Sequence, residues 1–166
     1  MTLNNTLKNV YLNHIAAFLP NAPVGNDEME AVLGMAGELP SRVRRMILRS
    51  NGIQTRHYAI DPDSCRATHT NAELAAEAVR RLFAQGIKPE DITSLSCATS
   101  YPDQTMPGHG VMVHGLLDIP SCEVLSMAGV CAAGMAAMKH AYNAVRTGEH
   151  AHAVAAASEN ASAVMR

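Results

Sequence analysis

The chain has 166 residues, of which 48% are hydrophobic and 17% charged, the balance of an ordinary globular protein with one substantial core. Its 13 Lys and Arg against 15 Asp and Glu give a formal charge of -2, and no five like charges stand together. Nucleic acid and anionic membranes are therefore not expected as partners. No stretch has the length of a membrane span, and the first 20 residues lack the apolar core of a signal peptide.

The four cysteines, Cys65, Cys97, Cys122 and Cys131, contain no CxxC pair. In a chain without an export signal, this spacing favours neither a disulfide framework nor a zinc site. We therefore expect a cytoplasmic protein with no metal or other cofactor.

The first 64 residues predict short elements separated by turns. Asn9 to Leu19 is mostly apolar and stops at Pro20, which favours a first strand. Short helices are expected from about Asn26 and again after Ser41, the second ending at Asn51-Gly52. A short extended piece over residues 53–60 then leads into a turn at residues 61–64.

Thr70-Asn71-Ala72-Glu73 matches a capping box, and apolar residues follow it at helical spacing as far as Gly86. This pattern predicts a helix from Asn71 to Gln85. The remaining elements are expected to be strands at residues 92–99, 122–127 and 152–157 and helices at residues 108–117 and 131–146. Helix-length crossovers between apolar strands predict an α/β fold with a largely parallel sheet covered on both faces.

Residues 124–135, VLSMAGVCAAGM, combine a strand, a turn of small residues and a helix that begins at Cys131. At a helix N-terminus the unpaired backbone N–H groups and the dipole favour the thiolate, which is the reactive form of cysteine. Ala, Gly and Met around this helix predict burial on several sides. The alternative from the residues alone is that Cys131 is a small buried hydrophobe.

This segment resembles the nucleophile segment of β-ketoacyl-acyl-carrier-protein synthase III. Three further segments are similar to segments of that family and occur in the same order. Arg49 to His57 looks like the family's Arg-Thr-Gly-Ile-x-x-Arg-His segment with one extra residue. The other two are Ala98-Thr99-Ser100 followed by Met106-Pro107, and Ala157-Ser158-Glu159-Asn160. The resemblance implies that residues 1–166 are the N-terminal half of a thiolase-like α/β fold, with a mostly parallel mixed sheet covered by helices.

The resemblance also implies an acyltransferase of fatty acid biosynthesis. Cys131 would take the acyl group from acyl-CoA or an acyl-carrier protein and pass it to a decarboxylating malonyl thioester, giving a β-ketoacyl product. Arg49 would contact a coenzyme A phosphate. In the expected homodimer, Met106 would reach the neighbouring subunit's acyl pocket.

In that family, a His and an Asn in the second half of the chain assist the cysteine. No His-Gln-Ala-Asn-like segment occurs between Met1 and Arg166, so we expect this chain to be inactive alone. His140 does not replace the missing base, because nine helical residues put it about 13 Å from Cys131 along the helix axis. For His109 and His114 the sequence favours polar or capping roles over catalysis.

Two classes of alternative remain open. One keeps thiol acyl transfer but changes the reaction to that of a thiolase, a hydroxymethylglutaryl-coenzyme A synthase or a plant-type polyketide synthase. The other is a non-catalytic dimerisation module in which the cysteine is unused.

Overall fold

The computed structural model describes residues 7–35 and 37–163. These residues form two compact units, one made of residues 7–18 and 71–159, and one made of residues 19–70 and 160–163. None of the helices in the described ranges combines the length and the apolarity needed to cross a bilayer.

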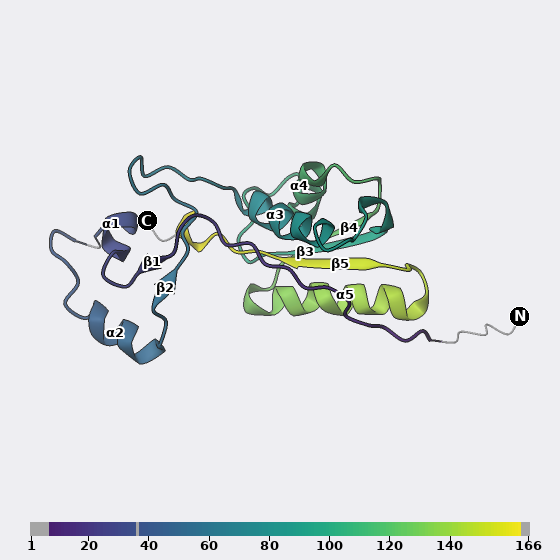
Figure 1. The fold of residues 1–166 in the computed structure, drawn as a ribbon, viewed down its shortest axis with the longest axis horizontal. Coiled ribbons are helices and arrows are strands. Elements are labelled where there is room, and N and C mark those ends of the chain that lie inside the picture. The colour runs from purple at the N-terminus through teal and green to yellow at the C-terminus, as the bar shows by residue number, and fades with distance from the viewer. Residues whose placement is uncertain (1–6, 36, 164–166) are drawn as a thin grey trace, which may run out of the picture. The chain divides into compact units, whose positions relative to one another are not determined.

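The first unit is built on a parallel three-stranded sheet (Figure 1). Its central strand β3 (Ser94–Ala98) pairs with β4 (Glu123–Met127) on one side and β5 (Ala153–Ala157) on the other. Helices α3 (Asn71–Phe83) and α4 (His109–Leu117) cover one face, and α5 (Ala133–Thr147) covers the other. This arrangement confirms the expected α/β fold with a parallel sheet between helices.

The core of this unit lies on the face of the sheet that α3 and α4 cover. Every residue of β3 is buried, as expected for a central strand with helices on both faces. Gly110 lets α4 approach β4 closely, because a Cβ atom at this position would lie 2.6 Å from the Leu125 carbonyl oxygen. The buried apolar side chains of the core include Val79, Ile92, Leu95, Cys97, Val113 and Leu117.

Helix α5 buries only one of its faces in this unit. Ala133, Ala137 and Ala144 are buried, whereas Met135 and Met138 are 66% and 48% exposed. The expected burial on several sides is therefore not present within the described chain. The small residues allow close packing against the sheet, and the larger apolar residues remain on the outer face.

The second unit is smaller. Strands β1 (Val24–Gly25) and β2 (Thr55–Arg56) pair antiparallel, and helices α1 (Met29–Leu33) and α2 (Arg44–Asn51) lie between them in sequence. Both helices begin two or three residues later than expected. Helix α2 ends at Gly52, whose φ of 71° is left-handed, as the Asn-Gly pair predicted. Val32, Tyr58 and Ile60 form a small core.

The sequence predicted a first strand from Asn9 to Leu19, and this prediction is wrong. Residues 9–19 form no strand, and Tyr11, Leu12 and Ile15 are each more than 70% exposed. Side chains of α3 and of the turn after it bind this segment instead, because Arg81 and Gln85 donate hydrogen bonds to the carbonyls of Ala17 and Ile15. An apolar pattern predicts a strand only where a partner strand pairs with its backbone, and no described strand does so here.

Candidate active site

The turn between β4 and α5 carries Cys131 and has an unusual backbone. Gly129 has a φ of 154° and Val130 a φ of 50°. A positive φ is rare for a β-branched residue and costs of the order of 1–3 kcal/mol. Such strain persists only where the surrounding structure imposes it, and it is concentrated at functional sites.

Cys131 lies in a 3₁₀ turn (Val130–Ala132), and α5 begins two residues later than expected, at Ala133. No side chain caps the start of α5. The backbone N–H groups of Ala132 and Ala133 donate instead to the carbonyls of Gly129 and Val130 within the 3₁₀ turn. The Cys131 side chain is exposed, as the small-residue turn predicted. The alternative of a small buried hydrophobe therefore does not describe this cysteine.

The other three cysteines have different surroundings. Cys97 is fully buried in β3, and burial, with the nearby Cys122, raises the pKa of its thiol to about 12. Cys122 is half-buried, and burial and the Glu123 charge raise its pKa as well. Cys65 is exposed, but it lies in the second unit within a turn rather than at a helix start.

Small residues bring the start of α5 close to the sheet. Ala98, Ala133 and Ala137 form a buried cluster with Met127 against it. A Cβ atom at Gly134 would lie 3.2 Å from the Ala157 side chain. Cys131 is thereby held at the edge formed by the carboxyl ends of the parallel strands, which is where α/β sheets bind ligands.

A network of polar side chains lies at the same edge of the sheet. Asn71 donates from Nδ2 to Thr99 Oγ1 at 2.7 Å and to the Tyr101 carbonyl at 2.9 Å. Asp103 accepts the N–H groups of Asn71 and Ala72 at 2.7 and 2.9 Å, so its carboxylate caps α3. The network therefore fixes the loop between β3 and α4 against the start of α3.

The network continues through the residues that follow β5. Glu159 accepts the backbone N–H of Ser100 and lies 3.5 Å from Thr99 Oγ1. Ser158 Oγ donates to the Asn71 carbonyl at 3.2 Å and lies 3.2 Å from His109 Nε2. The chain segments that follow β3 and β5 are thus joined by side chains.

His109, the first residue of α4, is only 3% exposed. Burial lowers the pKa of its imidazole, and the charges of Asp103 and Glu159 partly oppose that shift. Its Nδ1 atom and Asn71 Oδ1 are buried without a hydrogen-bond partner in the described chain. The sequence favoured a polar role for His109, and the contact with Ser158 agrees with that expectation.

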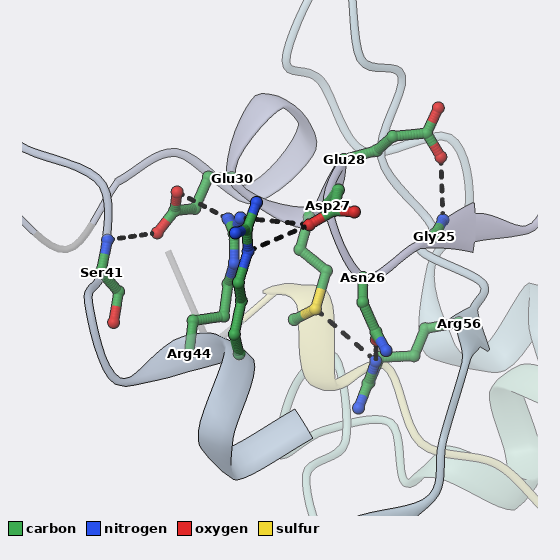
Figure 2. Close-up of polar contacts among 10 residues, drawn as sticks. Gly25, Asn26, Asp27, Glu28, Glu30, Ser41, Arg44 and Arg56 are labelled. Carbon is green, nitrogen blue, oxygen red and sulfur yellow. Dashed lines mark hydrogen bonds and ion pairs between the residues drawn. The ribbon is translucent and has the colours of Figure 1, made fainter. Parts of the chain in front are cut away.

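A separate cavity of about 380 Å³ lies in the second unit, where Arg44, Arg45 and Arg49 of α2 face the segment around Asn26 and Asp27. In Figure 2, Arg44 points toward Glu30 and Asp27, with shortest distances of 2.6 and 3.9 Å. Arg45 lies 3.8 Å from Asp27. Two of the three arginines are therefore paired with carboxylates.

Arg49 lines the same cavity and forms no ion pair with any residue in the described ranges. By contrast, Arg56 points toward Asn26 in Figure 2 and donates to its Oδ1 atom at 2.6 Å. Arg56 also lies 3.5 Å from Met29 Sδ. A guanidinium without a carboxylate partner beside a cavity is suited to a phosphate or carboxylate ligand.

Met106, the second residue expected in a binding role, is 83% exposed in the loop after β3. The structure keeps Cys131 and Met106 in the first unit and Arg49 in the second. His114, in α4, makes a local contact, since its Nε2 atom lies 3.1 Å from the Pro120 carbonyl. The Nδ1 atom of His140 lies 2.9 Å from the Oγ atom of Ser96.

The sequence did not predict the network of Asn71, Asp103, His109 and Glu159. Asn71 was assigned only to a helix start, and Asp103 carried no motif at all. The available signal was indirect, because polar residues that follow parallel strands gather at one sheet edge. The contacts themselves depend on tertiary packing between segments up to 87 residues apart.

No protein-family model matches the chain. It is 34% identical over 148 residues to the β-ketoacyl-[acyl-carrier-protein] synthase III of Sphingopyxis alaskensis, covering 89% of this chain and 42% of that protein. A synthase III of Cereibacter sphaeroides is 30% identical over 152 residues, covering 91% and 43%. The chain is similar to synthase III enzymes. It spans about two fifths of the length of these relatives.

Solved structures have the same fold. The tetronic acid condensing enzyme AbyA1 superposes with a TM-score of 0.65 and 30% identity, covering 78% of this chain and 39% of that one. A synthase III from Thermus thermophilus has a TM-score of 0.69 and 22% identity, covering 90% and 42%. The resemblance stated from the sequence and the thiolase-like fold are thus confirmed.

Proposed function

We propose that this chain is the nucleophile-bearing, N-terminal part of a synthase III-like acyltransferase, and that Cys131 accepts the acyl group. The observation that carries the proposal is the exposed Cys131 on a left-handed turn, directly before α5 and at the carboxyl edge of the parallel sheet. The similarity to synthase III enzymes over nine tenths of the chain supports the same chemistry.

In the first step, the Cys131 thiolate attacks the carbonyl carbon of an acyl thioester. The tetrahedral intermediate collapses, the C–S bond to coenzyme A or to a carrier thiol breaks, and an acyl-Cys131 thioester remains. The backbone N–H of Cys131, in the turn directly before α5, is the candidate donor to the oxyanion.

In the second step, a malonyl thioester loses carbon dioxide and the resulting carbanion attacks the acyl carbonyl. A carbon–carbon bond forms, the bond to Cys131 sulfur breaks, and a β-ketoacyl thioester leaves with the Cys131 thiolate restored. The described residues offer no His and Asn pair in the arrangement that the resemblance implies for this step. We therefore expect the 166-residue chain to accept an acyl group but not to complete condensation.

Arg49 supports coenzyme A as a donor. Its guanidinium lines the 380 Å³ cavity of the second unit without a carboxylate partner in the described part of the chain, and a phosphate would supply the missing charge. Met106, exposed on the loop after β3, is assigned to the acyl pocket of a neighbouring subunit in a homodimer.

A second candidate function is a different condensation reaction. The 30% identity to a tetronic acid condensing enzyme supports a tetronic acid condensation as the alternative to a β-ketoacyl product. The acyl-cysteine step is common to this candidate and to the thiolase-type alternatives, whereas a non-catalytic module has no such step.

The test is release of free coenzyme A when the purified chain is mixed with acetyl-CoA. The proposal predicts up to one equivalent of coenzyme A per chain, no release from Cys131→Ala, and unchanged release from Cys65→Ala, which removes the other exposed thiol. No release from the parent chain, or equal release from Cys131→Ala, would favour the non-catalytic module.

A further inference from the structure

A second group of polar side chains lies at the opposite, amino edge of the parallel sheet. Glu123 opens β4, and Glu149 and His150 belong to the connection between α5 and β5. The ligand atoms of these three side chains all lie within 4.8 Å of one another. Within residues 7–35 and 37–163 no other group of three such side chains comes as close.

Contacts from inside the sheet orient this group. His150 Nε2 lies 3.1 Å from Glu123 Oε2. The same oxygen accepts a hydrogen bond of 3.1 Å from Ser94 Oγ, and Ser94 is fully buried in the central strand directly opposite Glu123. His150 is held by its backbone N–H, which donates to the Ala144 carbonyl at 3.1 Å. The hydrogen bond from Ser94 is of the outer kind that orients carboxylate ligands at metal sites.

The carboxylates of the group have no Lys or Arg beside them among the described residues. In the part of the chain that the structure describes, no Lys or Arg pairs with Glu123 or Glu149. The imidazole nitrogen adds a donor that a solvated acidic patch lacks, and one nitrogen with two carboxylate oxygens is a ligand set that zinc accepts.

We propose that Glu123, Glu149 and His150 bind one divalent cation of the zinc type. Tetrahedral ligands about 2.1 Å from zinc lie about 3.4 Å from one another, so the three side chains, whose ligand atoms lie within 4.8 Å of one another, need to move only slightly closer together. Glu123 begins one edge strand and His150 precedes the other, with β3 between them. The ion would link the amino ends of both edge strands, away from Cys131 at the carboxyl edge.

The experiment is calorimetric titration of zinc chloride into the full 166-residue chain, with thermal unfolding measured in parallel. The exposed thiols of Cys65 and Cys131 are first alkylated with iodoacetamide, so that neither can ligate the ion. We expect one ion per chain and a rise in melting temperature of roughly 5–10 °C at about one hundred times Kd.

Two variants localise the site. Glu149→Gln removes a ligand that is exposed and has no ion pair in the described ranges, so folding is unaffected, and His150→Gln removes the nitrogen donor. Both should lose the zinc-dependent rise, while His152→Gln, an exposed histidine outside the group, should keep it. A parent chain that binds no zinc, or a His150→Gln chain that binds zinc as tightly as the parent, would overturn the proposal.

Discussion

At the scale of single residues, the cysteines are distinguished by burial. Cys131 is exposed on a turn, whereas Cys97 is fully buried with a thiol pKa raised to about 12. Only the thiolate reacts with alkylating reagents. The sequence predicted this contrast correctly, because it placed Cys97 inside an apolar strand and Cys131 after a turn of small residues.

Iodoacetamide at pH 8 should therefore modify Cys131 much faster than Cys97, since a buried thiol of pKa about 12 is almost fully protonated at that pH. Half-buried Cys122 should react at an intermediate rate. Peptide-mapped labelling measures all the rates in one sample, with Cys65 reporting the rate of an exposed thiol. Labelling of Cys131 no faster than Cys97 or Cys122 would remove the basis for a nucleophilic role.

His109 gives a prediction about pH. Burial lowers the imidazole pKa in the folded chain, so below about pH 6.5 the unfolded chain binds more protons than the folded one. The contribution of neutral His109 to stability is therefore complete above that pH and is lost as the pH falls. His109→Gln should cost about 1–2 kcal/mol at pH 7.5 through the lost buried contact with Ser158.

The difference in urea-unfolding free energy between the parent chain and His109→Gln should shrink between pH 7.5 and pH 5. His152→Gln, which changes an exposed histidine, should follow the parent chain at every pH. A His109→Gln deficit that stays constant or grows toward pH 5 would contradict a neutral, buried His109.

At the scale of elements, the sequence predicted best where local chemistry decides. The start of α3 at Asn71 and the end of α2 at Asn51-Gly52 were predicted from residues within a turn of each boundary, although the distant Asp103 also caps α3. The strand prediction for Asn9 to Leu19 was wrong, because an apolar pattern does not indicate whether a partner strand is present. The links among Asn71, His109 and Ser158 also lay beyond prediction, since they join the ends of separate elements.

The turn before α5 is an element whose backbone can be tested. Gly129→Ala should destabilise the chain by about 1 kcal/mol or more, because a φ of 154° is strained for any residue with a Cβ atom. Gly115→Ala is the matched control: it lies within α4 with open space around it and should stabilise by about 0.5–1 kcal/mol. Urea unfolding that ranks the two variants in the opposite order would contradict the described turn.

At the scale of the whole molecule, α5 presents an apolar outer face. Met135, Met138 and Tyr142 are each more than 40% exposed and recur at helical spacing. The chain also spans only about two fifths of the length of the synthase III relatives that it resembles. If it forms part of a longer enzyme, this face is where a second half would pack, and in the isolated chain it should drive self-association.

Light scattering at micromolar concentration should therefore detect oligomers of the purified chain. Met138→Glu should raise the dissociation constant about tenfold, equivalent to ~1.4 kcal/mol. Met46→Glu, at an exposed methionine of α2, serves as the control. Ala137 is unsuitable as a probe, because it is fully buried against the sheet and its replacement by Glu would disrupt folding. A stable monomeric parent chain would count against the half-enzyme proposal.

The central claim is that Cys131 accepts an acyl group, and the most direct measurement is the position of that group. The chain is incubated with acetyl-CoA, digested at low pH and analysed by fragment mass spectrometry. The account predicts a 42 Da increase, one acetyl group replacing one hydrogen, on the peptide that contains Cys131 and none on the peptide that contains Cys65, an equally accessible thiol. Acetylation of Cys65 to the same extent, or of neither cysteine, would contradict it.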